Sequence, residues 1–435
     1  MQLWTNTDRE LLALAVPTFA TLISEPLLVL ADTAFIGHVG STSLAGLGLG
    51  GNVLGVITGL CVFLAYSTTS VVARKIGAGD GAGAFRAGRD GMALGLVVGL
   101  VLAGLVVWLA PTIIGWYHPT PEVSVQAVTY LRIVVLGLPF QLVVLASTGL
   151  LRGMQDARTP LYVAIGVNLA NIALDAVLIY GLGLGIRGSA TATATAQVCS
   201  CLVLVAVIAR RASGDAIPLL PQLHGMVEAM AHGGWLVVRS AGLWISLTAM
   251  TVVATHLGPQ VLAANQVVNS VWAFIVFTLD ALAIACQALI GRQLGAGDVQ
   301  GAKTVMYRAL GWGCVQAVIV GAALIVARSL IIGLFTTDPE LMALLTDALV
   351  VLAFLQPLGS AVFVLDGVLI GAGDTRYLAL AGLIVVCAHL PMLGLVDHYN
   401  AGLVWLWIAY GGFLLARGVT LALRTRSGGW LKVGA

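Results

Sequence analysis

Long apolar stretches separated by short polar segments run along the whole chain. A helix that crosses a bilayer needs about 20 mainly apolar residues, and lipid offers no hydrogen-bond partners to backbone groups outside a helix. A window of this length predicts twelve spanning helices. Their approximate ranges are 11–38, 43–73, 89–110, 124–151, 160–181, 188–209, 234–256, 261–291, 304–328, 341–370, 376–396 and 402–423.

The composition agrees with lipid as the main solvent. Hydrophobic residues make up 59% of the 435 positions and charged residues only 9%, with a mean hydropathy of +1.01. Soluble proteins contain about 25% charged residues, so a water-facing surface cannot be built from so few charges. No stretch forms a basic face for nucleic acid. The sequence therefore predicts an all-α polytopic membrane protein whose partner is the lipid bilayer, not nucleic acid.

Lysine and arginine are distributed unevenly over the connecting segments. If the N-terminus is cytoplasmic, the opposite side holds little more than Arg187 and Arg328. The cytoplasmic side then holds Arg9, Arg74, Lys75, Arg86, Arg89, Arg152, Arg158, Arg210, Arg211, Arg292, Lys303, Arg308, Arg376, Arg424, Arg426 and Lys432. By the positive-inside rule, this asymmetry predicts a multi-pass protein of the cell (inner or plasma) membrane with both termini in the cytoplasm.

The two halves resemble each other at one fixed offset. The motif Gly-Ala-Gly-Asp at 77–80 recurs at 295–298, and 295 − 77 = 218. The same offset relates His38 to His256, Arg74 to Arg292, Pro139 to Pro357 and Asp156 to Asp374. Each repeat contains six spans, so we expect two pseudo-symmetric six-helix bundles related by an axis along the membrane normal. The expected division is an N-terminal bundle at 1–212, a cytoplasmic linker at 213–233 and a C-terminal bundle at 234–435.

Acidic residues inside the spans are the first candidates for function. They are Glu25, Asp32, Asp175, Asp280 and Asp366. A charged carboxylate at the centre of a membrane costs about 2.5–3.5 kcal/mol even on lenient scales, and such residues line functional paths. Asp32 and Asp175 have no acid at the repeat-equivalent positions, which are Met250 and Leu393. The repeat therefore builds a frame to which one half adds these acids.

Depth in the membrane relates three of the polar residues. Asp32 and Asp175 each lie six residues before the outer end of their predicted span, and Thr193 lies six residues after Arg187, which is just outside its span. At 1.5 Å per residue, all three lie roughly 9 Å below the outer boundary and have the depth needed to share one pocket. Asn168, Asn171 and Asp175 follow each other at spacings of three and four, so they share one helix face.

Prolines suggest how such a pocket would act. Pro17 and Pro26 remove backbone hydrogen bonds from the first span and make it able to bend. Buried acids close together favour the protonated form, so we hypothesise that protonation of Asp32 changes this bend. Asn265 and Asn269 form another polar face, suited to hydrogen bonding between helices or to contact with a substrate.

Four segments carry a resemblance to a known family. Pro26-Leu-Leu-Val-Leu-Ala-Asp-Thr-Ala-Phe-Ile-Gly-His38 ends the first span, and Arg-Lys-Ile-Gly-Ala-Gly-Asp at 74–80 follows the second. Leu-Arg-Gly-Met-Gln-Asp-Ala-Arg-Thr-Pro at 151–160 ends the fourth, and Asn-Leu-Ala-Asn-Ile-Ala-Leu-Asp at 168–175 lies in the fifth. Over essentially the whole chain, this pattern resembles the multidrug and toxic compound extrusion (MATE) family in its DNA-damage-inducible-F (DinF)-like branch.

The resemblance implies a fold and an activity. It implies two six-helix lobes in a V, alternating access, and antiport of H⁺ or Na⁺ against small organic cations by a monomer that needs no cofactor beyond the coupling ion. In the H⁺-coupled branch, the coupling residues fall on Asp32, Asn171, Asp175 and Thr193. The Na⁺-coupled branch relies on C-terminal acids; Asp280 and Asp366 are available there, but the seventh span contains no acid.

Other functions make different demands on the sequence. A flippase for lipid-linked precursors or polysaccharides would need several basic residues at mid-membrane, where Arg132 and Arg239 stand. An enzyme would need a nucleophile, a metal site or a cofactor loop, and we find none of these motifs; no metal is expected. The Gly-Ala-Gly-Asp segments follow helices and predict a helix end, with the Asp capping the next short helix.

Overall fold

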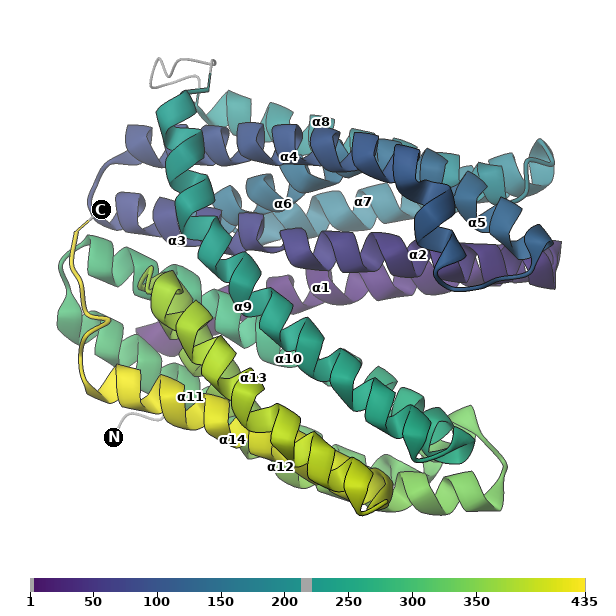
Figure 1. The fold of residues 1–435 in the computed structure, drawn as a ribbon. Coiled ribbons are helices and arrows are strands. Elements are labelled where there is room, and N and C mark those ends of the chain that lie inside the picture. The colour runs from purple at the N-terminus through teal and green to yellow at the C-terminus, as the bar shows by residue number, and fades with distance from the viewer. Residues whose placement is uncertain (1–3, 213–220, 435) are drawn as a thin grey trace. The chain divides into compact units, whose positions relative to one another are not determined.

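The computed structural model describes residues 4–212 and 221–434 (Figure 1). Within these residues, twelve helical spans are long and apolar enough to cross a membrane, which confirms the predicted number. The first six spans are α1 (Asn6–Val39), α2 with α3 (Ser41–Cys61, Phe63–Gly77), α4 (Gly81–Gly115), α5 with η1 and α6 (Pro121–Val134, Val135–Gly137, Leu138–Gly153), α7 with η2 (Arg158–Asp175, Ala176–Gly181) and α8 (Ile186–Ala212). The last six are α9 (Leu223–His256), α10 (Pro259–Gly295), α11 (Val299–Phe335), α12 (Pro339–Gly371), α13 (Thr375–His398) and α14 (Gly402–Arg426).

The chain divides into two compact units. The N-terminal unit is Ala20–Gly233, and the C-terminal unit combines Met1–Phe19 with Gly234–Ala435. The segment up to Phe19 thus groups with the C-terminal unit, and the residues up to Gly233 group with the N-terminal unit. Of the expected linker, 213–220 lies outside the described residues and Leu223 already begins α9. Both α1 and α9, the first helices of the two repeats, therefore contribute to both units.

The internal repeat reappears in the helix bounds and in the packing. Ser41–Gly77 and Pro259–Gly295 correspond at the offset of 218 residues, as do Pro121–Gly153 and Pro339–Gly371. A Cβ at Gly149 would strike the carbonyl oxygen of Ala65, and a Cβ at Gly367 would strike that of Ala283, its repeat equivalent. The same close approach of two helices is thus built twice.

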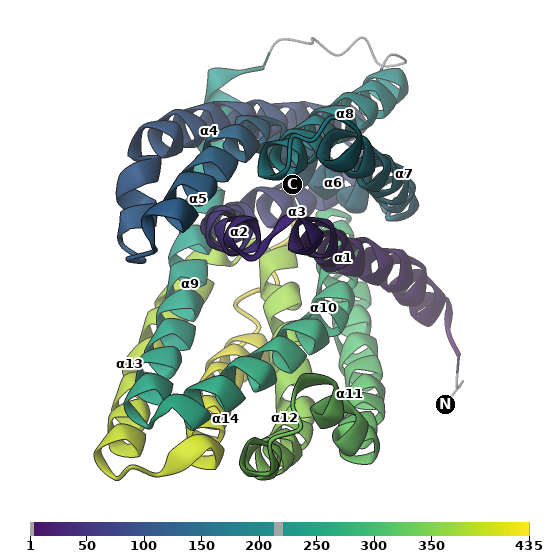
Figure 2. The ribbon, with the colours of Figure 1, turned by 90° about the vertical axis from the view of Figure 1, so that its right-hand side faces the viewer.

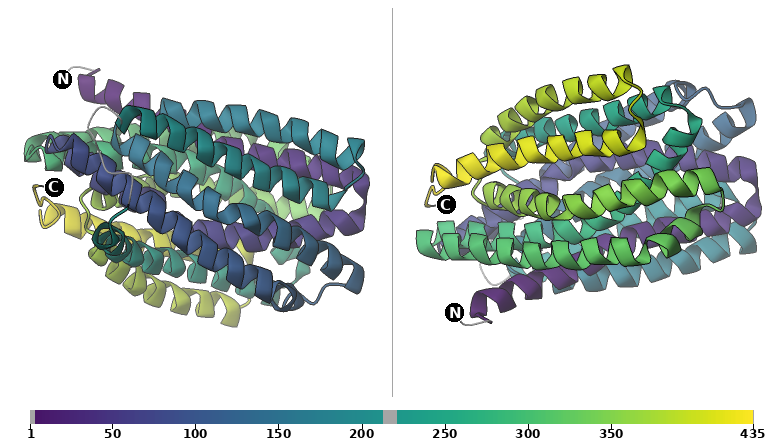
Figure 3. Two further views of the ribbon diagram at one scale, coloured as in Figure 1. Left: turned by 90° about the horizontal axis from the view of Figure 1, so that it is seen from above. Right: turned by 90° about the horizontal axis from the view of Figure 1, so that it is seen from below.

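Glycines also set the packing of α4 on α6, which run alongside each other in Figures 1 and 3. A Cβ at Gly95 would lie 2.9 Å from the carbonyl oxygen of Leu142, and one at Gly99 would collide with the backbone of Pro139. Small residues four apart let membrane helices approach closely, and van der Waals contact then holds them together. In the view of Figure 2, α5 lies against α2. Because α5 also contacts α4, it connects α2 to the packed helices α4 and α6.

The repeated Gly-Ala-Gly-Asp motif forms a turn and a cap, as predicted. Gly79 and Gly297 adopt φ values of 78° and 77°, a conformation that glycine reaches without a steric cost. Asp80 accepts a hydrogen bond from the backbone N–H of Gly83 at 2.7 Å, and Asp298 accepts one from Gly301 at 2.8 Å. The capped helices are the long spans α4 and α11 rather than short helices.

The two repeats share one turn conformation but place different residues in it. Gln155 has φ 66° where its repeat equivalent, Gly373, has φ 71°. A side chain in this left-handed region costs about 1–2 kcal/mol, only part of which is offset by the greater entropy that glycine loses on folding. We expect Gln155→Gly to raise the free energy of unfolding by about 0.5–1 kcal/mol, measured by denaturant titration in mixed micelles. Gly373→Gln should lower the free energy of unfolding. A loss of stability in Gln155→Gly would contradict the conclusion that the left-handed backbone at Gln155 is strained.

Candidate proton-coupling site

Two buried carboxyl groups meet inside the N-terminal unit. Asp32 of α1 is 5% exposed and Asp175 at the end of α7 is 0% exposed, and their side chains lie close enough to interact directly. Both oxygens of Asp175 and Oδ1 of Asp32 find no donor group among the described residues. Ionised carboxylates only accept hydrogen bonds. A hydrogen bond between the two groups therefore requires a proton on one of them.

The side chains around the two carboxyl groups are polar but uncharged, so they supply no positive charge to balance an ionised carboxylate. Asn171, one turn before Asp175 on α7, is 1% exposed, and both polar atoms of its side chain have no partner within the described chain. Tyr130 of α5 is 4% exposed and lies close enough to interact electrostatically with both carboxyl groups. Buried polar groups are normally hydrogen-bonded to protein or to ordered water. Such a cluster is suited to taking up a proton or water.

The backbone changes geometry directly after Asp175. Residues Ala176–Gly181 form a π-helical segment, η2, and Gly188 of α8 packs against it, since a Cβ there would lie 3.0–3.1 Å from the backbone of Leu178 and Ile179. Short π segments are rare and frequently occur at functional sites. The residue pattern does not predict this π-helical segment, because composition offers no signal for it.

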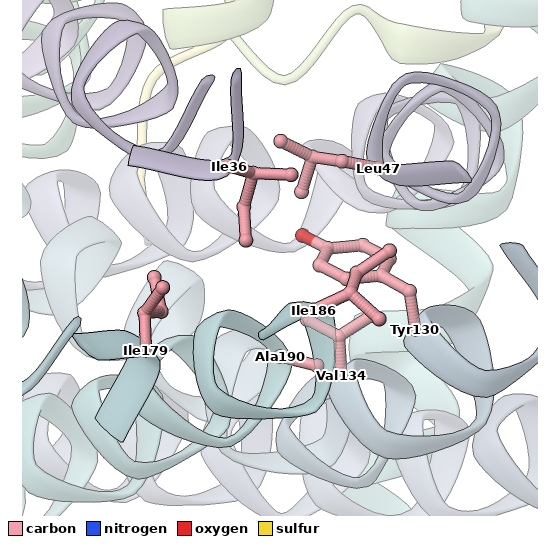
Figure 4. Packing of buried hydrophobic residues seen from close by; sticks show 7 residues of the cluster. All are labelled: Ile36, Leu47, Tyr130, Val134, Ile179, Ile186 and Ala190. Carbon is pink, nitrogen blue, oxygen red and sulfur yellow. The ribbon is translucent and has the colours of Figure 1, made fainter. Parts of the chain in front are cut away.

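An apolar layer covers the pair on one side. Ile36 and Ile179 lie four residues after Asp32 and Asp175, and both belong to a buried cluster (Figure 4). The other members are Leu47, Tyr130, Val134, Ile186 and Ala190. The Tyr130 hydroxyl oxygen points toward Ile36 and Leu47 in this view. An apolar layer next to two acids lowers the local dielectric and makes a second negative charge costly.

Two hydrogen bonds fasten α1 to the helix that carries Asp175. Asn168 Nδ2 donates to the carbonyl of Ser24 at 3.1 Å, and the Tyr180 hydroxyl donates to the carbonyl of Phe35 at 2.9 Å. Residues of α1, α7 and η2 other than the two acids line an apolar hollow of about 460 Å³. It is lined by Ala31, Ala34, Phe35, His38, Ile172 and Tyr180. Its volume lies in the range of sites for small molecules.

The other N-terminal candidates have contacts and exposure of their own, and their part in the site stays a prediction. The Thr193 hydroxyl donates to the carbonyl of Ser189 on its own helix at 3.1 Å. Glu25 has an exposed side chain. The helix α1 runs unbroken through Pro17 and Pro26, and the boundary between the two units falls between these prolines, after Phe19.

The C-terminal candidates have other surroundings. Asn265 on α10 is fully buried, and neither polar atom of its side chain has a partner in the part of the chain that the structure describes. Asn269 and Asp280, on the same helix, are half-buried. Asn265 and Asn269 thus differ in burial although they lie one turn apart.

Asp366 lies between two arginines. Arg417 Nη2 donates to its two oxygens at 2.9 and 3.0 Å, and Arg239 donates through Nε at 3.3 Å and also through Nη2. The three side chains are 7–10% exposed. Arg376, the basic residue ten positions further along the chain, lies over the ring of Trp235 instead. Both oxygens of Asp366 are occupied by guanidinium groups, which argues against cation binding there.

Arg417 is a residue that the sequence analysis missed. It lies inside the predicted last span, and a lone arginine in an apolar run was the available signal. Arg132, counted there as a mid-membrane basic residue, is exposed, and its Nε lies 3.3 Å from the carbonyl oxygen of Val107. The C-terminal unit therefore contains a buried group of two cations and one anion that sequence alone did not assemble.

Comparison with known proteins decides the family. The MatE family profile matches residues 17–177 and 236–393, one match in each repeat. The chain belongs to the MatE family. It is a multi-pass membrane protein, and this MATE chain is 30% identical to Protein DETOXIFICATION 44, chloroplastic, of Arabidopsis thaliana, over 97% of the chain and 83% of that relative.

One further relative agrees with this family, and a solved structure shares the fold. The MATE chain is 29% identical to DNA damage-inducible protein F of Escherichia coli (strain K12), covering 99% of the chain and 95% of that relative. This confirms the resemblance to the DinF-like branch. The fold of the MATE chain matches a solved structure described as the outward-facing conformation of a multidrug resistance MATE family transporter. The TM-score is 0.88 at 22% identity, and the match covers 99% of this chain and 98% of the other.

Proposed function

We propose that this MATE chain is a secondary active multidrug exporter that exchanges H⁺ for organic, mainly cationic, drugs. The observation that carries the proposal is the contact between Asp32 and Asp175, two buried carboxyl groups that need a proton to form a hydrogen bond. A site that holds one proton and cannot easily hold two negative charges is suited to coupling.

The proposed cycle follows from the surroundings of the pair. With one proton bound, the carboxyl groups hold α1 and α7 together. When a cation enters the apolar hollow lined by Phe35 and Tyr180, its charge favours ionisation of the pair and release of the proton. The added negative charge weakens the contact between the helices, and α1 changes its bend between Pro17 and Pro26. Alternating access of the two lobes would then follow.

The exchanged ion is proposed to be H⁺ rather than Na⁺. A sodium site in the C-terminal unit would draw on Asp366, whose oxygens already accept from Arg239 and Arg417. The same pairing weighs against the flippase alternative, because these two guanidinium groups are engaged with a carboxylate rather than open to a pyrophosphate. As part of the proposal, both termini lie in the cytoplasm and the protein acts as a monomer in the cell membrane.

Transport in a defined system tests this proposal. Purified protein in proteoliposomes should move ethidium or norfloxacin when a pH gradient is imposed, and should show no transport with a Na⁺ gradient at equal pH on both sides. Protein-free liposomes give the background. Transport driven by Na⁺ alone would contradict proton coupling, and absence of drug movement under both gradients would contradict drug export.

A further inference from the structure

A polar cavity of about 190 Å³ lies in the N-terminal unit between α3, α4 and the first turns of α9. None of its lining residues belongs to the site around Asp32. Its charged lining residues are Lys75, Arg86, Asp90 and Glu228. A cavity that presents both signs of charge suits a ligand that also carries both.

Asp90 connects two of the helices that line the cavity. It pairs with Arg89 at 2.8 Å and accepts a hydrogen bond from the backbone N–H of Gln222 at 3.1 Å. Gly225 packs so closely against this carboxylate that a Cβ there would collide with it. Asp90 therefore fixes the start of α9 onto α4, and its charge is already balanced.

The remaining charges are available to a ligand. Lys75 and Arg86 each reach Asp80 only at 3.9 Å, with side chains 31% and 48% exposed, and exposed pairs of this kind are weak. Glu228 is exposed and makes no hydrogen bond or ion pair with the residues that the structure describes. Two cations and one carboxylate thus face the cavity without a strong partner.

The first turns of α9 are amphipathic. Leu223, Val227 and Met230, at spacings of four and three, are 76%, 59% and 41% exposed and form an apolar stripe. His224 and Glu228, one turn apart on the neighbouring face, line the cavity. A charged cavity beside an exposed apolar stripe matches an amphiphile with a polar head and hydrocarbon chains.

We propose that this cavity binds the headgroup of a phosphatidylethanolamine-type phospholipid. The phosphate lies at Lys75 and Arg86, the ammonium group donates to Glu228, and an acyl chain covers the apolar stripe of α9. A purely anionic headgroup would leave Glu228 facing negative charge. A choline headgroup has no N–H to donate to it. The inference uses only the membrane location of the chain and does not depend on proton coupling.

Native mass spectrometry of bound lipid tests the proposal. The full-length protein is reconstituted in nanodiscs with equal parts of phosphatidylethanolamine, phosphatidylcholine and phosphatidylglycerol, then stripped with increasing detergent. Wild-type protein should retain phosphatidylethanolamine about tenfold over phosphatidylcholine, as expected for one charge-assisted hydrogen bond. Glu228→Gln should bring this ratio to about one, and the Lys75→Gln/Arg86→Gln variant should lose retained lipid of every class.

Matched variants separate the site from general effects of charge. Glu122→Gln and Arg187→Gln change exposed residues outside the cavity and should leave lipid retention unchanged. Thermal unfolding in detergent identifies any variant that fails to fold, and Lys75→Arg with Arg86→Lys should then retain the lipid. Equal retention of phosphatidylethanolamine and phosphatidylcholine by wild-type protein would overturn the proposal. So would equal retention of phosphatidylglycerol, or displacement of the lipid by inorganic phosphate.

Discussion

Asp32→Asn should reduce pH-gradient-driven drug efflux from proteoliposomes to the level of protein-free liposomes, and Asp175→Asn should do the same. Either amide removes a titrating group from the pair, so no proton can be exchanged at the site. Because the two carboxyl groups act as one unit, the double variant should lose no more transport than either single variant.

The same substitutions should not unfold the protein. In Asp32→Asn, the introduced amide can donate to Asp175, whose oxygens have no other donor among the described residues, so thermal stability should be retained or increased. Asp347→Asn, an exposed change on α12, serves as the control and should transport normally. Normal efflux from Asp32→Asn vesicles would refute the coupling role of the pair.

Asp366→Ala should have the largest effect on stability, a loss of about 3–5 kcal/mol in the free energy of unfolding. The substitution leaves the guanidinium groups of Arg239 and Arg417 buried without their counter-ion, and a buried unpaired charge is far more costly than a missing hydrogen bond. Denaturant titration of the purified protein in mixed micelles measures the loss.

Two further variants distinguish burial of charge from loss of a side chain. Asp347→Ala, on the exposed face of the same helix, should change stability by no more than about 0.5 kcal/mol. Combining Asp366→Leu with Arg239→Met and Arg417→Met should recover most of the loss, because apolar residues can replace a buried ionic group without net cost. If Asp366→Ala costs no more than Asp347→Ala, the three charged groups are solvated and the explanation is wrong.

Part of the N-terminal site was accessible from the sequence. Asp32 and Asp175 stand out because a carboxyl group in an apolar run is costly, and their equal distance from the ends of their spans predicted equal depth. The structure brings these two together. Thr193 was predicted at the same depth; its hydroxyl donates to the carbonyl of Ser189 on its own helix, and its part in the site stays a prediction. Depth is a property of one helix, whereas contact also requires that each helix be turned so that the two side chains face each other.

The C-terminal unit shows where sequence reasoning stopped. Arg376 lies only ten residues along the chain from Asp366, but Asp366 pairs with Arg239 and Arg417 from two other helices. Local spacing can propose a neighbour in sequence. It cannot show which side chains from three different helices point to the same buried place.

The sequence by itself determined the solvent, the twelve spans and the repeat, because hydropathy and a fixed offset of 218 residues are properties that can be measured along one chain. Only the tertiary structure decided the contact of Asp32 with Asp175, the π-helical segment after Asp175, and the two arginines on Asp366. These features depend on the rotation of each helix about its axis and on close packing against its neighbours, which many sequences with the same hydropathy would settle differently.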